Sequence, residues 1–286
     1  MTAPQLGRYG IWSMELRFGD PAQIGEAAAE LDELGFGALW VPGGIGGDIT
    51  GDLDRLLAAT RRMAIATGII NVWKHEPAEI AGWFTALPAD RQSRVMLGLG
   101  ISHGPLIGEA WQKPLAKMAD WIGQLTAAGV PASSQCVAAL RPKMLELSGR
   151  ITAGAHPYLV DVTHTAKARD ILGPYALLAP EQGVILETDR AKIRELAGHA
   201  LTHYARLPNY CNSWLALGYT QEDIDGQSDR FIDGIFASGT PEQVKDRLDA
   251  HLAAGASHVC AQVIAAPGTP LEDTRAQWRA LAQVLR

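Results

Sequence analysis

Residues 63–102 constrain the fold of this chain more than any other segment. The segment begins with an apolar, β-branched run at 64–70 and closes with a second apolar run at 95–100. Between the two runs, Pro77 starts a helix whose apolar residues recur at steps of three and four. Two nearly continuous apolar strands joined by an amphipathic helix indicate a parallel sheet that helices cover.

The alternation of strand and helix continues along the chain. We predict eight strands, at residues 10–14, 38–41, 64–70, 95–100, 136–140, 153–160, 183–187 and 257–264. Helices separate them, one of them at 53–63, and residues 189–239 are predicted to be mostly helical with a loop at 207–212. The pattern predicts an α/β fold, a (β/α)8 TIM barrel with extra helices between strands seven and eight; an open doubly wound sheet is the alternative. Because no linker or repeat divides the sequence, residues 1–286 are expected to form a single domain.

Several helix ends carry capping residues. Asp20 followed by Pro21 predicts the start of a helix, and Gly35 predicts its end. The sequence TPEQ at 240–243 has the spacing of a capping box, which satisfies two free backbone N–H groups. Thr269 is predicted to cap the last helix in the same way.

The composition argues against several classes of partner. A formal net charge of −6 argues against a nucleic-acid-binding surface and against an anionic membrane surface. No apolar run reaches the roughly 18 residues needed to span a bilayer, and residues 1–10 lack the pattern of a signal peptide. Cys136, Cys211 and Cys260 are odd in number and have no metal-ligand spacing. We therefore expect reduced thiols, no metal site and a cytoplasmic location.

Barrel enzymes carry their chemistry at the carboxyl ends of the strands. The residues at those ends are Trp12, Ser13, Gly43, Gly44, Gly68, Ile69, Asn71, Trp73, His75, Gly100, Ile101, Ser102, His103, Leu140, Arg141, Pro142, His156, Tyr158 and Glu187. The set is poor in carboxylates and has neither a cysteine nucleophile nor a cluster of His, Asp and Glu suited to a metal. It is rich in aromatic rings, small residues and backbone amides. Such a site favours a flat, mostly apolar ligand held by packing and main-chain hydrogen bonds.

Several segments resemble the bacterial luciferase-like flavin and deazaflavin oxidoreductases. The third and fourth strand units of that family are similar to ATGIINVWKHEPAEIAGWFTAL and RVMLGLGISHG, and its second strand to GALWVPGG. Its closing segment resembles GTPEQVKDRLDAHLAAGASHVCAQVI. The segments HPYLV and LPNYCNSWLALGY are similar to an actinobacterial subgroup associated with coenzyme F420. The resemblance implies a barrel that binds F420, or alternatively FMN, and that assembles as a homodimer through its second and third helices.

The resemblance assigns cofactor contacts to the third strand. It implies a bulge with a non-proline cis peptide between Gly68 and Ile69, which supports the back of the tricyclic ring. An ordinary strand end with a glycine is the alternative. The resemblance also implies that Ser102 bonds the polar edge of the ring and that Trp12 forms the floor of the cleft. The other residues expected around the ring are Ser13, Gly43, Gly44, Asn71, Trp73, Gly100 and Ile101.

Leu140, Arg141 and Pro142 join the end of strand five to a helix. Free amides, the positive end of the helix dipole and the charges of Arg141 and Lys143 favour an anion at this point. The resemblance implies that the cofactor phosphate binds here. Solvated surface charges are the alternative.

Gly43 and Gly44 depart from one branch of the family. In deazaflavin sugar-phosphate dehydrogenases an acidic residue followed by a catalytic His occupies this position, so that activity is not expected here. A replacement proton donor would come from His75, His103, His156 or Tyr158. We rank His156 first, because a histidine with a pKa near 6.5 exchanges protons at neutral pH. A core histidine bonded to the backbone is the alternative.

Four functions are compatible with these residues. The first is an F420-dependent oxidoreductase that transfers a hydride between deazaflavin and a small, hydrophobic organic substrate. The second is an FMN-dependent luciferase-like monooxygenase. The third is a non-catalytic flavin-binding or F420-binding relative, which the missing side chains at Gly43 and Gly44 favour. The fourth is a non-redox barrel such as an aldolase, for which only Lys74 and Glu187 are candidates. The sequence leaves the substrate and the direction of hydride transfer open.

Overall fold

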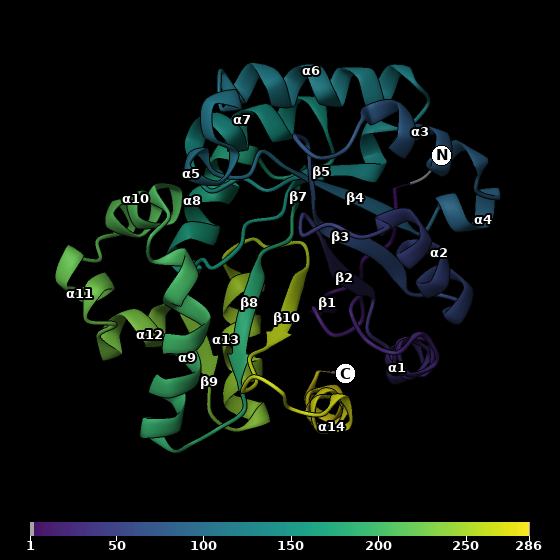
Figure 1. Ribbon diagram of the computed structural model, residues 1–286. Helices are drawn as coiled ribbons and strands as arrows, with labels where there is room; N and C mark the ends of the chain where they lie inside the picture. The colour runs from purple at the N-terminus through teal and green to yellow at the C-terminus, as the bar shows by residue number, and fades with distance from the viewer. Residues whose placement is uncertain (1–2, 286) are drawn as a thin grey trace.

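The computed structural model describes residues 3–285 and contains one sheet of parallel strands surrounded by helices (Figure 1). The strand order is β7-β6-β5-β4-β3-β2-β1-β10-β8-β9. The strands are β1 (Tyr9–Trp12), β2 (Ala38–Gly43), β3 (Ala64–Asn71), β4 (Val95–Gly100), β5 (Gln135–Val137), β6 (Gly154–Ala155), β7 (Leu177–Leu178), β8 (Glu181–Ile185), β9 (Phe236–Ser238) and β10 (Val259–Val263).

The sheet closes into a barrel because β7 and β8 are two parts of one strand. Only Ala179 and Pro180 separate them, and β7 pairs with β6 while β8 pairs with β10. The amide of Glu181 donates to Pro157 O at 2.8 Å, and the amide of Cys260 donates to Pro180 O at 3.0 Å. Residues 177–185 are therefore bonded on both sides, as ring closure requires. The predicted (β/α)8 barrel is confirmed, with β9 as an additional strand paired to β8.

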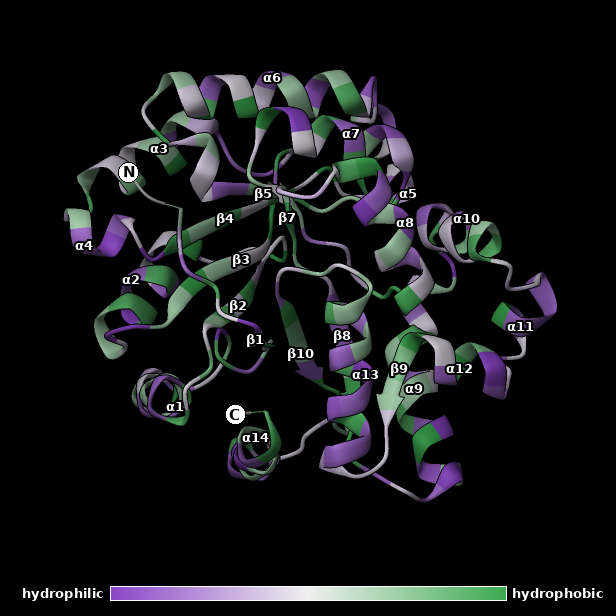
Figure 2. Ribbon diagram, turned by 180° about the vertical axis from the view of Figure 1, so that it is seen from behind, coloured by the Kyte–Doolittle hydropathy of each residue, from purple (hydrophilic) through white to green (hydrophobic). Residues whose placement is uncertain are grey.

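Helices form the outer layer of the molecule (Figure 1). They are α1 (Pro21–Leu34), α2 (Ile49–Ala59), α3 (Pro77–Ala86), α4 (Ala89–Gln92), α5 (Gly104–Ile107), α6 (Pro114–Ala127), α7 (Pro142–Ile151), α8 (Val162–Leu172), α9 (Arg190–Tyr204), α10 (Pro208–Leu217), α11 (Gln221–Asp225), α12 (Asp229–Ile235), α13 (Pro241–Ala253) and α14 (Leu271–Val284), with 3-10 turns at Gly108–Ala110 and Ala132–Ser134. In Figure 2 the helices carry both hydrophilic and hydrophobic residues, as expected for helices between a sheet and solvent. The predicted extra helices before the last barrel strand are α9 to α12, which lie together at one side (Figure 1).

Several predicted boundaries are wrong, each for a local reason. The predicted loop at 207–212 is instead the start of α10, which Pro208 begins. The predicted helix at 53–63 runs from Ile49 to Ala59, because Asp48 caps it and accepts a hydrogen bond from Gly51 N. The predicted strand 153–160 shrinks to β6, since Pro157 has no N–H and Leu159 has a φ of 53°. The strands β7 and β9 were not predicted, because strands of two or three residues are too short to show a periodic pattern of apolar residues.

The capping signals are mostly confirmed. The Asp20 side chain accepts hydrogen bonds from Ala22 N and Gln23 N, and Gly35 ends α1 with a φ of 92°. The capping box at 240–243 forms with both reciprocal bonds. The cap predicted at Thr269 is wrong, because Pro270 is the N-cap residue and the Thr269 hydroxyl donates to Ala266 O.

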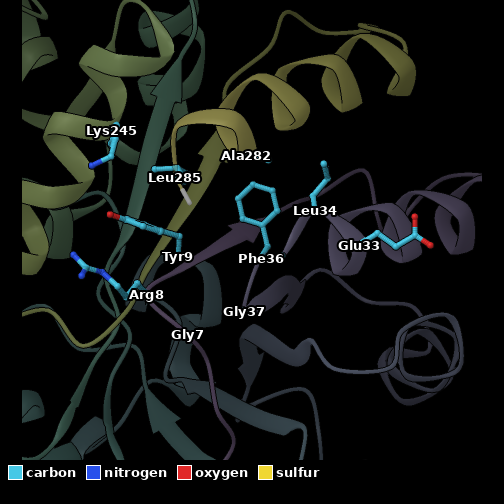
Figure 3. A pocket seen from close by; sticks show the side chains of 11 residues that line it. Gly7, Arg8, Tyr9, Glu33, Leu34, Phe36, Gly37, Lys245, Ala282 and Leu285 are labelled. Carbon is cyan, nitrogen blue, oxygen red and sulfur yellow. The ribbon is translucent and has the colours of Figure 1, made fainter.

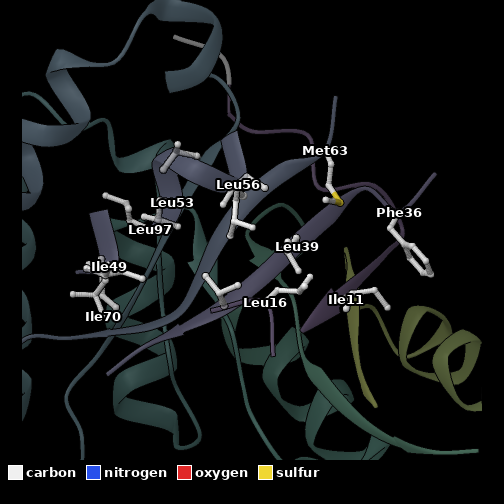
Figure 4. Packing of buried hydrophobic residues seen from close by; sticks show 14 of the residues in the cluster. Ile11, Leu16, Phe36, Leu39, Ile49, Leu53, Leu56, Met63, Ile70 and Leu97 are labelled. Carbon is white, nitrogen blue, oxygen red and sulfur yellow. The ribbon is translucent and has the colours of Figure 1, made fainter. Parts of the chain in front are cut away.

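The core has two layers. The outer layer packs strand side chains against helices, and Figure 4 shows Leu39 of β2 next to Leu56 of α2. The barrel interior is lined mainly by small side chains, with Trp40 filling the space that they leave. The Trp40 indole donates to His258 Nε2 at 3.1 Å. A Cβ at Gly10 would lie 2.7 Å from His258 Cε1, so this glycine is needed for the histidine to enter.

Cys136 and Cys260 are buried, Cys211 is half-buried, and none of the three forms a disulfide. In residues 3–285 no helix is both long enough and apolar enough to cross a membrane.

Candidate functional site

The third strand is irregular at the predicted bulge. The pairing of β3 with β4 shifts register between Ala66 and Ile70, and its pairing with β2 shifts between Val41 and Gly43. The Gly68–Ile69 peptide is cis, as predicted from the family resemblance. Gly68 and Ile69 are half-buried, whereas the preceding residues of β3 are buried. This stretch of backbone is therefore accessible at the carboxyl end of the barrel.

Glycines on both neighbouring strands make room for Ile69. A Cβ at Gly100 of β4 would lie 2.1 Å from Ile69 Cδ1, and a Cβ at Gly43 of β2 would lie 3.0 Å from Ile69 O. Real Cβ atoms essentially never approach another atom as closely as 2.1 Å, and a contact of 3.0 Å is tighter than most, so a side chain at either position requires its neighbours to shift. Gly43 and Gly100 thus have a packing role in the bulge, beside the cofactor contact predicted for them.

Trp12 and His156 pack directly beneath Gly68. A Cβ at Gly68 would lie 2.3 Å from Trp12 Nε1 and 3.1 Å from His156 Nε2. Both nitrogens are buried and have no hydrogen-bond partner among the described residues. Trp12 therefore lies where a floor of the cleft was predicted.

His156 is a neutral imidazole in this environment. Its Nδ1 donates to Ala179 O at 2.7 Å, which leaves a lone pair on Nε2. The ring is 1% exposed, and burial lowers its pKa to about 4. A neutral ring whose only N–H is bonded to the backbone has no proton to give at neutral pH. The geometry thus favours the alternative of a core histidine over the proton donor ranked first from sequence.

An aromatic cluster borders the bulge. The Tyr158 ring lies 5.7 Å from the Trp12 ring and 5.5 Å from that of Tyr204. Tyr210 continues the cluster, 5.0 Å from Tyr204 and 5.3 Å from His103. Two predicted candidates, Tyr158 and His103, therefore meet the same group of rings. Tyr204 and Tyr210 were not singled out from sequence, although Tyr210 lies in the quoted segment LPNYCNSWLALGY.

Arg17, also missed from sequence, organises the loop after β2. Its Nε donates to Asp52 Oδ2 at 2.9 Å, and its two terminal nitrogens donate to Pro42 O and Gly46 O. The side chain is fully buried. Because all three nitrogen groups are used, Arg17 ties the first two strand loops and α2 together.

Lys74 and His75 hold the same glycine loop from the other side. Lys74 Nζ donates to Gly44 O at 3.2 Å, and His75 Nε2 lies 3.2 Å from Gly43 O. Both residues therefore bond the scaffold. Lys74 is exposed and bonded to backbone, which does not suit the Schiff-base role considered for an aldolase.

Several predicted ring contacts also stabilise the loops. The Trp73 indole donates to Ile101 O at 2.7 Å, and Asn71 Oδ1 accepts from Trp73 N. The Ser13 hydroxyl donates to Glu15 and accepts from Leu16 N, so this buried serine closes a turn after β1. Ser102 is half-buried and has a left-handed φ of 63°.

The predicted phosphate site is the start of α7. Arg141 is the N-cap residue, Pro142 is the first helical residue, and no side chain caps the helix. Arg141 and Lys143 are exposed, while Leu140 O accepts from His164 Nε2 at 2.8 Å. An uncapped helix start with two free cations has the chemistry of an anion site.

One part of the chain matches a known protein family. Residues 5–129 match the family model of the luciferase-like monooxygenases. This segment is similar to the luciferase-like monooxygenase family. It spans β1 to β4 and contains the bulge, whereas Arg141, His156 and Tyr158 lie beyond it. No curated protein matches the chain significantly.

Several solved structures share the fold over nearly the whole chain. An F420-dependent secondary alcohol dehydrogenase in complex with an F420-acetone adduct has 14% identity and a TM-score of 0.74, covering 100% of both chains. The F420-dependent tetrahydromethanopterin reductase from Methanopyrus kandleri has 16% identity and a TM-score of 0.68, covering 98% of each chain. The oxygenating constituent of 3,6-diketocamphane monooxygenase from Pseudomonas putida, in complex with FMN, has 12% identity and a TM-score of 0.70, covering 98% of this chain and 97% of the other. At these identities the matches establish the fold.

A buried carboxyl group of the barrel was missed from sequence. Glu181 begins β8 and is 0% exposed. Its Oε2 accepts from Leu159 N at 2.9 Å, its Oε1 has no partner among the described residues, and burial raises its pKa to about 8. One indication of this buried acid was present in the sequence, a glutamate at the start of the strand EQGVI.

A cavity of about 650 Å³ lies at the opposite end of the barrel, at the start of β1 (Figure 3). It is lined by Gly7, Arg8, Tyr9, Glu33, Leu34, Gly35, Phe36, Gly37, Lys245, Ala282 and Leu285. It has no residue in common with the predicted site. In residues 3–285 no three His, Cys, Asp or Glu side chains gather closely enough to hold a metal ion.

Proposed function

We propose that this protein is an F420-dependent oxidoreductase that transfers a hydride between deazaflavin and a small, hydrophobic organic substrate. The observation that carries the proposal is the accessible Gly68–Ile69 backbone, which lies among glycine-containing strand ends and beside the aromatic cluster of Trp12, Tyr158, Tyr204, Tyr210 and His103. The shared fold with two F420-dependent enzymes supports the choice of cofactor.

The residues present fit a flat cofactor that carries a phosphate. A planar ring packs well against backbone and against aromatic side chains, and Trp12 and His156 lie next to Gly68 here. The uncapped start of α7, with Arg141 and Lys143 exposed beside it, would hold the phosphate. The other residues proposed to contact the cofactor are Ser13, Gly43, Gly44, Asn71, Gly100, Ile101, Ser102, Leu140 and Pro142.

A bound deazaflavin would supply the hydride chemistry, and the protein would orient the substrate and handle the proton. Tyr158 is half-buried, and its hydroxyl donates to Gln262 Oε1 at 2.8 Å, which holds it in place. Burial raises its pKa, so the hydroxyl keeps its proton at neutral pH, and the O–H would rotate from Gln262 toward the substrate to donate it. His103 is half-buried, and burial lowers its pKa, so it is neutral at pH 7 and able to accept a proton. We therefore assign proton handling to Tyr158 and His103, and a supporting role beneath the ring to His156.

Binding measurements test this proposal directly. Purified protein is titrated with oxidised F420 and, separately, with reduced FMN, and oxygen uptake is recorded in both cases. We expect saturable binding of F420 without oxygen consumption. Absence of F420 binding at concentrations that saturate an F420-dependent enzyme of the same fold would overturn the proposal.

An FMN-dependent monooxygenase is the second candidate. It is favoured by the common fold with the FMN-containing oxygenating constituent from Pseudomonas putida. It predicts binding of reduced FMN and consumption of oxygen in the presence of substrate. A non-catalytic relative would bind F420 without turnover on any member of a broad panel of unsaturated and carbonyl compounds.

A further inference from the structure

Glu181 is a buried acid without a counter-ion. It lies in the barrel at the register of Cys260 on β10, with no exposed surface. The carboxyl accepts one hydrogen bond, from Leu159 N, and in residues 3–285 no cation pairs with it. An isolated carboxylate is very unfavourable in such an environment, so the group keeps its proton instead.

The groups that face Glu181 are polar but uncharged. They come from four elements: Tyr158 after β6, Tyr204 on α9, Tyr210 on α10 and Cys260 on β10. The charge of an ionised Glu181 would raise the pKa of each of them. None of the four is a base that could share the proton of Glu181 at neutral pH.

The hydrogen bond of Glu181 fixes the turn that carries Tyr158. Leu159 has a φ of 53°, a left-handed conformation that residues other than glycine and asparagine rarely adopt. Its N–H donates to Glu181 Oε2 at 2.9 Å, and its carbonyl accepts from Trp214 Nε1 at 3.0 Å. With both polar backbone groups bonded, the turn is held, and the Tyr158 ring is directed toward Trp12.

We propose that Glu181 is a positioning residue for Tyr158: as a neutral carboxylic acid it holds the Tyr158–Leu159 turn and keeps negative charge away from the Tyr158 hydroxyl. The assignment of Tyr158 to the reacting site rests on the proposed function, whereas the protonation of Glu181 does not. No proton leaves Glu181 during the reaction. We therefore expect the enzymatic activity to fall at alkaline pH, when Glu181 ionises close to Tyr158.

The protonation of Glu181 is tested without cofactor. The melting temperatures of wild type, Glu181→Gln and Glu195→Gln are measured from pH 4 to 9; Glu195 is exposed on α9 and serves as the matched control. The pKa of Glu181 is raised from 4.5 in the unfolded chain to about 8. Wild type therefore loses stability relative to Glu181→Gln as the pH rises from 4.5 to about 8, and the difference in melting temperature between the two proteins stays constant above that pH. Parallel curves for wild type and Glu181→Gln would overturn the proposal.

Infrared difference spectra give a second measurement of the same proton. Wild type at pH 7 is expected to show the C=O stretch of a buried carboxylic acid, which Glu181→Gln lacks and Glu195→Gln keeps. A carboxylate signal for Glu181 at pH 7 would also overturn the proposal.

The positioning role is tested with F420 and a turned-over substrate. We expect Glu181→Gln to keep activity at pH 7 and to lose the alkaline limb of the kcat profile. Glu181→Ala and Tyr158→Phe should each lower kcat at least roughly tenfold, with little change in KM and no further loss in the double variant. Undiminished kcat in a folded Glu181→Ala protein would refute the positioning role. Failure of wild type to bind F420 would refute the proposed function alone, since the stability and infrared measurements would still decide the state of Glu181.

Discussion

The imidazole of His156 lies flat against the indole of Trp40, with ring centroids 4.1 Å apart and planes 13° from parallel. The two side chains come from β2 and the end of β6, on different sides of the barrel. Together with the bond from Nδ1 to Ala179 O, this stacking buries the histidine in its neutral form. A residue that would titrate freely on a loop is thus part of the barrel core.

His156 makes the protein sensitive to acid. Its folded pKa of about 4 is below its ordinary value of 6.5, so its contribution to stability is complete above pH 6.5 and is lost as pH falls through 4. We expect His156→Asn to unfold with a weaker pH dependence across this window and to be less stable by about 1–3 kcal/mol at pH 7. Urea denaturation at pH 7 and pH 4.5 measures both effects. The control is His199→Asn, at an exposed position. If the unfolding free energy of wild type and of His156→Asn changed equally between pH 7 and pH 4.5, His156 would not be a buried neutral histidine.

Gly100→Ala is expected to disturb the bulge. The new Cβ would lie 2.1 Å from Ile69 Cδ1, which must move, so we expect a loss of about 1–3 kcal/mol and weaker F420 binding. Gly82→Ala is the matched control: it lies on the exposed face of α3 with no atom within 4 Å of the new Cβ, and should be about 0.5–1 kcal/mol more stable than wild type. Chemical denaturation compares the two, and equal stability of both variants would show that Ile69 is free to shift.

Arg17 and Arg55 offer a comparison of two cations on one carboxylate. Both pair with Asp52, but the Arg17 side chain is fully buried and also bonds two carbonyls, whereas that of Arg55 is 36% exposed. We expect Arg17→Ala to cost about 3–5 kcal/mol and Arg55→Ala about 0–1 kcal/mol. Thermal unfolding measures stability, and limited proteolysis reports cleavage in the loop at 43–48. Similar behaviour of the two variants would argue against an organising role for Arg17.

Arg141→Gln is expected to weaken F420 binding roughly tenfold, because a charge-assisted contact to phosphate is lost. The matched control is Arg150→Gln, at the opposite end of α7, where a cation faces the negative end of the helix dipole. Titrations at low and high salt should show the affinity difference shrinking as salt is added. An unchanged Kd of Arg141→Gln for F420 would show that the cofactor phosphate does not bind at the start of α7.

The sequence predicted the order of barrel strands well and the short elements poorly. The strand at 95–100 was predicted to the residue, because a buried parallel strand is a continuous apolar run bounded by polar residues. By contrast, β7 and β9 are strands because their backbones pair with β6 and β8, and such pairing leaves no pattern in two or three residues. The cis peptide at Gly68 was predicted from family resemblance and not from any pattern of residues. The homodimer and the hydrophobic character of the substrate remain predictions.

By itself the sequence determined the alternation of strands and helices, several helix ends and the absence of a long apolar span, because these depend on residues only a few positions apart. Tertiary structure alone decided which polar residues are buried. Glu181 meets Leu159, Trp12 and His156 meet beneath Gly68, and each of these contacts joins residues more than twenty positions apart. Their protonation follows from the loss of water around them, which no local pattern records.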